Sequence, residues 1–588
     1  MLRTHNCGAL RKEDIGEEVL LAGWVNRRRD HGGVIFIDLR DRWGLTQLVI
    51  NSNQPEIYQS ANAVKSEFVL QVKGIVRARP EGLANLKLPT GEIEVAVSEV
   101  KILSESKPLP FEIEEKNETD ESLRLHYRYL DLRRTRMQKN LILRHQVCQS
   151  VRRYLSERQF IEVETPFLTK STPEGARDFL VPSRLSEGNF YALPQSPQLF
   201  KQILMIAGYD RYFQIAKCFR DEDLRADRQP EFSQVDIEMS FVEREDIFEL
   251  IETMMKKLFY EVLGIQLETP FPRMSYDEAM NCYGCDKPDL RISCTIDDLS
   301  LLLEDKIEVG SKSDSWNGLF LQEWKGFSRK KADLLSQMAK NAGVSLSYIK
   351  FAKEEGTSPL KNKISEQAWS KIIEKYPFQE DSLLLMAWGE RPKVLTFLGN
   401  LRINLGEELN LIQNQFKFCW ILDFPLFEWN AEENRWDSMH HPFTAPRLDQ
   451  LDQLNIDPSQ VKAQAYDIVL NGFEIGGGSI RIHRSDLQEK IFQLLNLSEG
   501  EIQQKFGYFI EALQYGCPPH GGIALGLDRI MMLMSGESSI RETMAFPKTQ
   551  KGTCLMSGAP SPVSNDQLMV LGIQLREKKE SKAIKEDS

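Results

Sequence analysis

Residues 212–240 begin with Tyr212-Phe-Gln-Ile-Ala-Lys-Cys-Phe-Arg-Asp-Glu-Asp-Leu-Arg225 and end with Gln234-Val-Asp-Ile-Glu-Met-Ser240. Apolar residues rich in β-formers flank a charged loop that runs through Arg228-Gln-Pro-Glu-Phe232, which predicts two strands joined by a long loop. An Arg that leaves a strand can bind a phosphate through two parallel N–H groups, which Lys cannot do as rigidly. The alternative interpretation is a charged hairpin tip, and Arg220 alone does not decide between them.

A second pattern lies in Gly521-Gly-Ile-Ala-Leu-Gly-Leu-Asp-Arg529, which leads into Ile530-Met-Met-Leu-Met534. The glycines suit close backbone approach at a turn, and the apolar run predicts the start of a helix. Arg529 falls near that start, where a cation is unfavourable beside the helix dipole unless an anionic ligand is present. A glycine loop by itself remains a weak signal.

A third pattern is Tyr466-Asp-Ile-Val-Leu-Asn-Gly-Phe-Glu-Ile-Gly-Gly-Gly-Ser-Ile-Arg481. Asp467 and Glu474 are oxygen ligands of the kind that Mg²⁺ takes, usually one or two carboxylates with the rest shared between phosphate and water. The alternative is a pair of strand carboxylates that face solvent. Three glycines in a strand reduce its stability, so we expect close backbone approach to a ligand there.

The N-terminal hundred residues predict a small barrel. Five runs are rich in β-branched residues and separated by turn residues, at 19–25, 34–39, 46–50, 68–76 and 91–97. Five strands in so short a segment fit the oligonucleotide-binding (OB) barrel. Arg27, Arg28 and Arg29 follow the first expected strand and Phe36 lies on the second, which suits single-stranded nucleic acid as well as it suits a solvated hairpin.

Charge and composition exclude little. The net charge is −12, which argues against a polyanion partner. The segment from Arg124 to Arg144, however, is rich in Arg and Lys and contains a single acid, Asp131. The nine Cys include one isolated Cys282-x-x-Cys285 pair, so we expect free thiols and no zinc site. The N-terminus lacks an apolar signal core and no run is long enough to cross a bilayer, so we expect a cytoplasmic protein without a membrane partner.

Together these motifs resemble the class II aminoacyl-tRNA synthetases. Phe219-Arg-x-Glu and Gly-x-Gly-Leu-Asp-Arg529 resemble the second and third signature motifs of that class, and Phe160-Ile-Glu-Val-Glu-Thr-Pro166 resembles the first, which implies a homodimer. The barrel is similar to that of the aspartate, asparagine and lysine subgroup. Thr172-Pro-Glu-Gly-Ala-Arg-Asp178 and Gln195-Ser-Pro-Gln-Leu-Phe-Lys201 resemble the bacterial aspartyl enzymes, as does a long insertion.

The resemblance implies a multidomain α+β fold: an N-terminal five-stranded OB barrel, a class II antiparallel-sheet catalytic domain and an inserted α+β domain. The expected boundaries are an anticodon-binding barrel at 1–106, a linker at 107–135, catalytic parts at 136–287 and 417–560, an insertion at 288–416 and a C-terminal extension at 561–588. We expect the charged tail of that extension to be disordered.

The same resemblance implies the ATP site. Arg220 is expected on the α-phosphate, Glu222 on the nucleotide and Arg529 on the γ-phosphate, which makes them the catalytic residues. Asp467 and Glu474 are expected to hold Mg²⁺ against the phosphates. The remaining nucleotide contacts that the family implies are Asp221, Gln229, Gly526, Leu527 and Asp528.

For L-aspartate the resemblance implies a cationic pocket. Arg481 is the expected bidentate partner of the side-chain carboxylate, with Lys201 adding charge and Arg220 close by. The ammonium group would be received by Glu174, Gln198 and Asp236. His440 and His441 are expected to close over the amino acid, although a solvent-exposed His pair is the alternative. An asparagine enzyme would have less need of such cations.

On the barrel, Arg27, Arg28, Arg29, Phe36 and Gln47 match the anticodon-binding positions of the family, and the basic run would lie beneath the tRNA. His31 and Gly82 resemble the branch that loads both tRNA(Asp) and tRNA(Asn), because neutral His can donate or accept and Gly excludes no base. We therefore expect an aspartate–tRNA(Asp/Asn) ligase. A strict tRNA(Asp) enzyme, an asparagine enzyme and a catalytically inactive RNA-binding paralogue are the alternatives.

Overall fold

The computed structural model describes residues 1–114, 119–172, 176–303, 311, 314–352 and 355–576. The chain forms two compact units, Met1–Lys139 and Asn140–Ser588, which are described separately. In the described part of the chain, no helix is both long and apolar enough to cross a membrane. The predicted tail disorder falls on residues 577–588, which lie outside the described residues.

The first unit contains a closed barrel with the strand order β1-β2-β3-β5-β4. Its strands are β1 (Glu18–Asp30), β2 (Val34–Arg40), β3 (Leu45–Asn51), β4 (Val69–Ala78) and β5 (Ile93–Ser104), with the helix α1 (Pro55–Asn62) and the short η1 (Lys12–Asp14). Alternate strand residues fill its core, among them Leu21, Ile37, Leu48 and Val72. The predicted five-stranded barrel is confirmed.

One detail of the barrel prediction is wrong. Arg27, Arg28 and Arg29 do not follow the first strand but belong to β1, which extends to Asp30. A bulge between Val25 and Arg27 bends the strand and lets pairing with β2 continue as far as Asp30↔Ile35.

Three helices follow the barrel: α2 (Glu121–His126), α3 (Arg128–Asp131) and α4 (Thr135–Glu157), the last of which continues into the second unit. Three cations of the basic run in this segment have a partner inside the protein. Arg124, Arg128 and Arg134 all converge on the buried carboxylate of Asp131, at 3.3, 2.5 and 3.5 Å. A buried carboxylate needs such partners, so these cations are used inside the protein.

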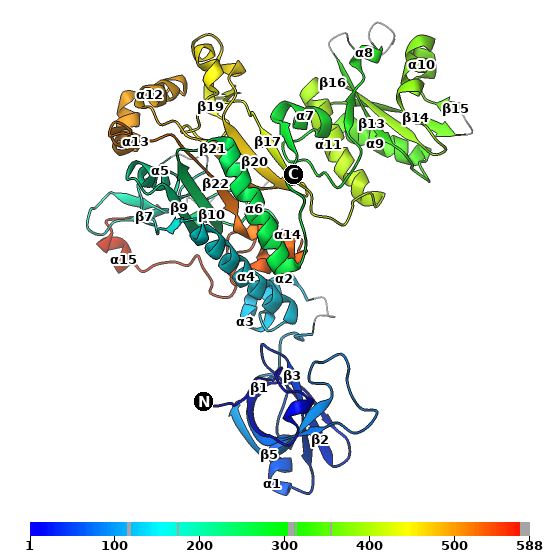
Figure 1. Cartoon of the computed structure of the whole chain (residues 1–588), viewed down its shortest axis with the longest axis vertical. Coiled ribbons are helices and arrows are strands. Elements are labelled where there is room, and N and C mark those ends of the chain that lie inside the picture. Colours follow the sequence, from blue (N-terminus) through cyan, green and yellow to red (C-terminus); the bar gives the residue numbers. More distant parts are fainter. Residues whose placement is uncertain (115–118, 173–175, 304–310, 312–313, 353–354, 577–588) are drawn as a thin grey trace, which may run out of the picture. The chain divides into compact units, whose positions relative to one another are not determined.

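The second unit is built on an eight-stranded sheet with the order β11-β17-β20-β21-β22-β10-β9-β6 (Figure 1). The strands are β6 (Ile161–Glu162), β9 (Arg211–Phe219), β10 (Glu231–Ser240), β11 (Arg273–Ser275), β17 (Phe418–Leu422), β20 (Ala465–Leu470), β21 (Phe473–Ile480) and β22 (His520–Gly526). Inner pairs are antiparallel, and a parallel pair closes each edge. The predicted antiparallel catalytic sheet is confirmed.

Helices cover one face of this sheet. Apolar side chains of α4, α6 (Arg244–Leu263) and α14 (Leu527–Ser535) pack with sheet residues such as Ile237 and Ile523 in one core. Around the sheet lie α5 (Gln198–Ile206), α7 (Tyr276–Tyr283), α12 (Ser485–Leu494), α13 (Glu499–Leu513), α15 (Asn565–Val570), η3 (Leu448–Asn455), η4 (Pro458–Gln460), η5 (Ile540–Thr543) and the pairs β7 (Leu180–Pro182) with β8 (Phe190–Ala192) and β18 (Phe427–Asn430) with β19 (Arg435–Ser438). The sequence predicted a turn at Gly521 and Gly522. Both residues lie instead within β22, which pairs with β10 on one side and β21 on the other.

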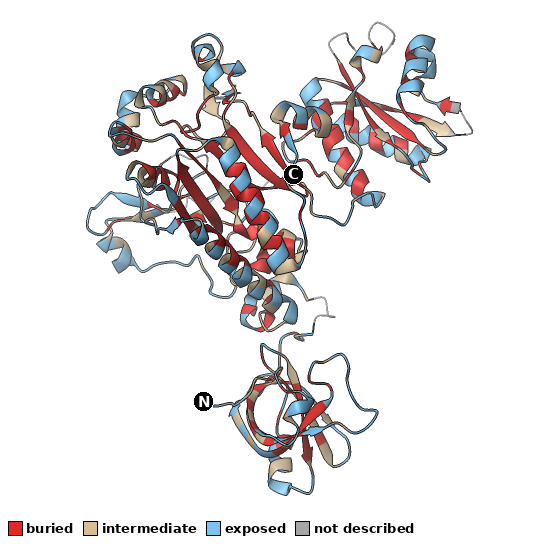
Figure 2. Cartoon of the chain, in the orientation of Figure 1, coloured by how far each residue is buried: buried red, intermediate tan, exposed pale blue. Residues whose placement is uncertain are grey.

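A five-stranded sheet with the order β12-β13-β16-β14-β15 interrupts the sequence of the larger one. Its elements are β12 (Ile296–Asp298), α8 (Ser300–Leu303), β13 (Ser315–Leu321), α9 (Arg329–Asn341), β14 (Ser345–Ala352), β15 (Glu355–Thr357), η2 (Lys361–Lys363), α10 (Glu366–Lys375), β16 (Leu383–Gly389) and α11 (Arg391–Glu408). Separate apolar clusters occupy its two faces, so β13 and β16 are buried along most of their length (Figure 2). The predicted inserted α+β fold is confirmed.

Candidate active site

A cleft of about 540 Å³ opens on the face of the eight-stranded sheet. Its walls come from the β9–β10 loop, the β20–β21 hairpin, the β22–α14 junction and α5, so segments far apart in sequence meet there. The cleft brings together most of the predicted residues: Gln198, Lys201, Arg220, Glu222, Gln229, His440, Asp467, Glu474, Arg481, Gly526, Asp528 and Arg529. The three patterns recognised in the sequence therefore form one site.

The cleft has a cationic end that is fully buried. Lys201 on α5 donates to Asp236 at 2.6 Å and lies 3.3 Å from Glu238, and both acids point from β10. Arg481 donates Nε and Nη2 to Glu238 at 2.9 and 3.2 Å. These four side chains are at most 1% exposed, so two cations balance two carboxylates out of water.

His441 lies against this cluster. Burial, then Arg481 and His440, lower the pKa of His441 well below its ordinary value, so the ring is neutral. Arg481 Nη1 lies 2.7 Å from His441 Nε2, and because Arg can only donate, Nε2 is the acceptor. Nη1 also donates to Ser479 at 2.8 Å, so both of its N–H groups are used, and one N–H of Nη2 is left for a ligand.

Two carboxylates face each other on the β20–β21 hairpin. A Cβ atom on Gly477 would lie 2.6 Å from Asp467 Oδ1 and 3.9 Å from Glu474 Oε1, which explains the glycine at this position. Burial, and then the charge of Asp467, raise the pKa of Glu474. Asp467 Oδ1 is buried without a hydrogen-bond partner in the described structure. His440 Nε2 lies 3.6 Å from that oxygen.

These features fit a divalent cation shared with a ligand. Two adjacent carboxylates that repel each other are stabilised by a cation between them. The described residues form no group of three or more His, Cys, Asp or Glu that could enclose a metal alone. Mg²⁺ commonly takes one or two carboxylates and completes its shell with water and phosphate oxygens, so this donor set suits it.

The charged loop between β9 and β10 supplies the other end of the cleft. Arg220 leaves β9 and lies over the ring of Phe232 at 5.2 Å, with its Nη1 3.9 Å from Glu222. Glu222 also accepts from Arg228 at 2.8 Å. Across the cleft Arg529 at the start of α14 donates to the main-chain oxygen of Glu474 and, at 3.2 Å, to Asp227. The cations near a helix start and a strand end can bind polyphosphate.

Several other buried polar atoms at the cleft have no hydrogen-bond partner among the described residues. Among the described residues, buried atoms without a hydrogen-bond partner include Gln198 Nε2, Arg220 Nε, Asp236 Oδ2 and His440 Nδ1. Buried polar atoms are normally paired, and these belong to residues that line the cleft or touch its cationic end. Their convergence is what a polar ligand site requires.

Several predicted nucleotide contacts have partners within the protein. Gln229 exchanges two hydrogen bonds with the main chain of Lys548, at 2.7 and 3.0 Å. Asp528 accepts from Arg144 on α4 at 2.5 Å and from the Ser233 amide at 2.7 Å. The side chain of Leu527 belongs to the apolar core.

Asp221 is not among the residues that line the cleft. Asp221 is exposed and pairs with Arg177. Glu174 lies outside the described residues.

The sequence patterns missed Glu238, Asp227 and Asp286. Glu238 stands two residues after Asp236 on one strand, so period-2 alternation places it on the same face and could have revealed it. Asp286 precedes the five-stranded sheet and lines the cleft beside His440. No local sequence pattern indicates this position of Asp286.

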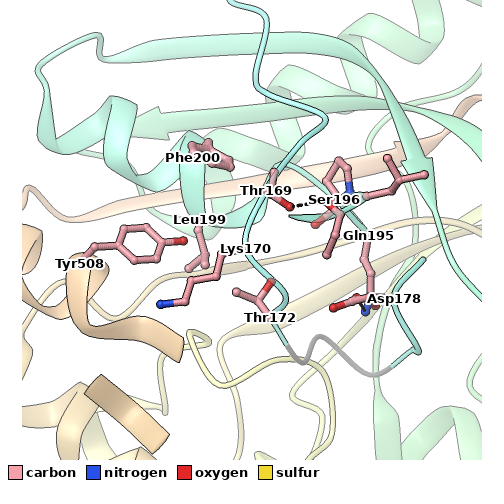
Figure 3. A pocket seen from close by; sticks show the side chains of 12 residues that line it. Thr169, Lys170, Thr172, Asp178, Gln195, Ser196, Leu199, Phe200 and Tyr508 are labelled. Atoms are coloured by element: carbon pink, nitrogen blue, oxygen red, sulfur yellow. Dashed lines mark hydrogen bonds between the residues drawn. The ribbon is translucent and has the colours of Figure 1, made fainter. Parts of the chain in front are cut away.

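A smaller hollow of about 20 Å³ adjoins the cleft, since both are lined by Ser196. Figure 3 shows the side chains that line it, among them Lys170, Thr172, Gln195 and Tyr508. Gln195 donates to Ala176 and Asp178 at 2.7 and 2.6 Å and so holds the chain that follows Glu174. The volume is enough for water and too small for a substrate.

In the first unit, strand register aligns one polar row on the outside of the barrel. Arg27 pairs with Asp38, and Asp38 pairs with Gln47. Gln47 donates to the buried Glu94 at 3.0 Å, and Glu94 accepts from Arg77 at 2.8 Å. The contact with Glu94, a pure acceptor, fixes the amide of Gln47 so that its oxygen faces Arg29 at 3.5 Å.

The remaining barrel predictions divide. Phe36 lies beside the ring of His31, with centroids 5.7 Å apart, next to Arg29 on the neighbouring strand. Gly82 has φ +81° in the loop before β5 and no atom close to its Cβ position. Arg28 points away to α1, where it donates to Asn62 at 2.6 Å, because successive strand residues face opposite sides.

Comparison with known proteins identifies both parts. Residues 120–550 match the model of the class II tRNA synthetases (D, K and N), and residues 19–103 match that of OB-fold nucleic acid binding domains. An aspartate–tRNA(Asp/Asn) ligase of Thermodesulfovibrio yellowstonii is 52% identical over 98% of this chain and 100% of its own length. One of Aquifex aeolicus is 51% identical over 98% of both chains.

Solved structures agree on the fold. An asparaginyl-tRNA synthetase from Pyrococcus horikoshii, solved with asparaginyl-adenylate, covers 93% of this chain and 99% of its own, with a TM-score of 0.60 and 20% identity. An aspartyl-tRNA synthetase from Entamoeba histolytica covers 91% of this chain and 89% of its own, with a TM-score of 0.56 and 20% identity. At such identity the likeness concerns the fold alone.

Proposed function

Because the chain belongs to the class II tRNA synthetases of the D, K and N group, we propose that it is an aspartate–tRNA(Asp/Asn) ligase. The observation that carries the choice of amino acid is the buried pair Lys201 and Arg481 at the closed end of the cleft. Relatives about half identical over nearly their whole length bear the same name.

In the first step an oxygen of the α-carboxylate of aspartate attacks the α-phosphorus of ATP. The bond to the bridging oxygen breaks, pyrophosphate leaves with the electron pair, and aspartyl-adenylate forms. Arg220 at the end of β9 stabilises the charge that develops on the α-phosphate, which is electrostatic catalysis by a preformed donor. Neither a Ser nor a Cys nucleophile is needed, because the substrate carboxylate attacks.

Arg529 and Glu222 hold the two ends of the nucleotide, with Arg529 toward the γ-phosphate. Asp467 and Glu474 would hold Mg²⁺, which would supply positive charge against the phosphates. Asp528 and Gln229 contribute indirectly, since Asp528 fixes the start of the helix that carries Arg529 and Gln229 fixes the loop that carries Glu222. Gly526 and Leu527 offer only main-chain groups to ATP, because the Leu527 side chain is in the core.

The side-chain carboxylate of aspartate meets the remaining Nη2 N–H of Arg481 and the ammonium group of Lys201. Its ammonium group meets Asp236 Oδ2 and the nearby Gln198, with Glu174 as a further contact. His441 is neutral and accepts from Arg481, so it adds no third charge to the pocket. An asparagine side chain offers the two cations one neutral amide oxygen, whereas an aspartate side chain offers two charged acceptors, and this favours aspartate.

In the second step a hydroxyl at the 3′ end of tRNA attacks the carbonyl carbon of the adenylate, and AMP leaves. The polar row on the barrel, with Phe36 and His31 beside it, receives the anticodon. His31 can donate or accept, and Gly82 carries no side chain that would exclude a base, which supports loading of tRNA(Asn) as well as tRNA(Asp).

The first test is pyrophosphate–ATP exchange with each amino acid. Aspartate should support it and asparagine should not; exchange that requires asparagine would overturn the proposal, and its absence with both would favour an inactive RNA-binding paralogue. The second test is loading of purified tRNA(Asp) and tRNA(Asn) transcripts with labelled aspartate. Comparable kcat/KM is expected, whereas discrimination of a hundredfold, about 2.7 kcal/mol, would indicate a strict tRNA(Asp) enzyme.

A homodimer is part of the proposal. β6 forms an edge of the large sheet, and Ile161, Phe167 and Leu168 in the first motif region are about half exposed. Covering such side chains with a second copy would remove apolar surface from water. Sedimentation equilibrium should give twice the chain mass, and Ile161→Asp should shift the protein toward monomer.

A further inference from the structure

Glu67 stands out in the barrel as a buried carboxylate in an unusual backbone conformation. It lies between α1 and β4, is 3% exposed and has φ +63°. For a residue other than Gly this conformation is strained, and it persists where the surroundings require the side chain. The contacts of Glu67 indicate what requires it.

Two arginines meet on Glu67. Arg40, at the end of β2, donates Nη2 to both carboxylate oxygens at 2.8 and 2.9 Å, and its Nη1 donates to Asn26 at 2.5 Å. Arg133 donates Nη1 to Glu67 Oε2 at 2.7 Å. Arg40 belongs to the barrel, whereas Arg133 belongs to the turn between α3 and α4.

A second contact fixes Arg133 from another side. Its guanidinium lies over the indole of Trp24 on β1, 5.3 Å from the ring centroid. A charge-assisted hydrogen bond and a cation–π contact thus hold one side chain on the barrel wall. The same turn is braced from within by Asp131, which accepts from Arg124 and Arg128.

We propose that Glu67 and Trp24 form a dock for Arg133 that holds the start of α4 on the barrel, and that tRNA loading depends on this dock while adenylate formation does not. The inference rests on the proposed function. A tRNA held by the barrel must also present its 3′ end at the adenylate, and a loosened barrel lowers the effective concentration of that end.

The dock gives Arg133 a role other than the RNA contact that its place in the basic run suggests. Glu67 is too buried to touch tRNA, so an effect of Glu67 on tRNA use must pass through its arginines. Arg133, with a side chain 28% exposed, is the one of the two that reaches outside the barrel.

The test uses the full-length protein and the variants Glu67→Gln, Arg133→Met and their combination, with Lys139→Met as a charge-matched control. Lys139 is an exposed cation two turns further along the same segment. We expect aspartate-dependent pyrophosphate exchange within about twofold of the parent and a KM for tRNA(Asp) raised about tenfold in both single variants. The double variant should have a KM for tRNA(Asp) no higher than that of either single variant, because all three variants lose the same contact between Glu67 and Arg133.

Salt dependence separates the dock from an RNA contact. Loss of a phosphate contact lowers the slope of log affinity against log salt by about one, whereas loss of an internal contact leaves it unchanged. A reduced slope for Arg133→Met with normal tRNA use by Glu67→Gln would overturn the proposal, and so would normal tRNA use by both variants.

Folding is checked by thermal unfolding of each variant. If Glu67→Gln unfolds the barrel, Arg133→Met and Lys139→Met decide the question by KM and salt slope, since Arg133 is partly exposed and its loss leaves the Glu67–Arg40 pair intact. Absence of aspartate-dependent exchange in the parent protein would count against the proposed function instead, so the two failures are distinguishable.

Discussion

Arg481 donates Nε and Nη2 to the two carboxylate oxygens of Glu238, and both side chains are at most 1% exposed. This pairing fixes the guanidinium before any ligand arrives, and because Nη1 is used by His441 and Ser479, one N–H of Nη2 is left for a ligand. Lys201 is held by the same carboxylate and by Asp236. Recognition of an acidic amino acid therefore depends on an acid that need not touch it.

The first prediction concerns Glu238→Gln. The variant should lower kcat/KM for aspartate by a hundredfold or more, roughly 2–5 kcal/mol, because Arg481 and Lys201 lose their shared charge partner. The effect should lie mainly in KM for aspartate, measured by pyrophosphate exchange. Glu252→Gln is the control, since Glu252 is also buried but bonds to Trp420 in the core. An unchanged KM for aspartate in Glu238→Gln would contradict the assignment.

The second prediction concerns stability and pH at Glu474. Burial and Asp467 raise its pKa, so its folded state prefers the proton; the associated stability is present below the ordinary Glu pKa and is lost as pH rises through the raised value. With chelator at pH 7.5, Glu474→Gln should therefore have a higher apparent Tm than the parent, and the gap should shrink toward pH 5.

The activity of the Glu474→Gln variant should fall although its stability rises. Glu474→Gln should lose most exchange activity, and Mg²⁺ should raise the apparent Tm of the parent more than that of the variant, because a carboxylate ligand is gone. Equal stabilisation of both proteins by Mg²⁺ would argue against a metal at this hairpin.

The third prediction distinguishes the structural role of Asp528, tested through its partner Arg144, from the ATP-binding role of Arg529. Arg144→Met leaves the nearly buried Asp528 without its ion-pair partner, so we expect a loss of stability of about 3–5 kcal/mol and a lower apparent Tm. Arg529→Met removes a cation from the cleft wall and should raise KM for ATP with little change in Tm. Calorimetry together with exchange kinetics checks both, and a stable Arg144→Met protein would be inconsistent with a structural role for Asp528.

The fourth prediction concerns the barrel face. Phe36→Ala should weaken tRNA use by about 1–3 kcal/mol through loss of a stacking surface, while pyrophosphate exchange stays normal. Phe36→Leu keeps apolar bulk without a ring and serves as the matched comparison. If the ring stacks on a base, both variants should raise KM for tRNA(Asp); if Leu restores full loading, Phe36 serves packing only.

Local sequence patterns determined the elements. Runs rich in β-branched residues predicted the barrel strands, and the apolar runs on either side of the charged loop predicted β9 and β10. The apolar run after Arg529 predicted the start of a helix, and α14 lies there. The nature of the chemistry was also readable, because Arg, carboxylate and glycine at these places suit phosphate and Mg²⁺.

Tertiary structure alone decided which of those side chains are available. Arg128 and Arg134 looked like a surface for RNA, yet they are used by Asp131; Gln229 and Asp528 looked like nucleotide contacts, yet they bond to Lys548 and Arg144. The physical reason is that the sequence gives the residue type at each position, whereas the hydrogen-bond or ion-pair partner of that residue can be tens or hundreds of positions away in the chain. The desolvation that forces such pairing exists only once the chain is folded.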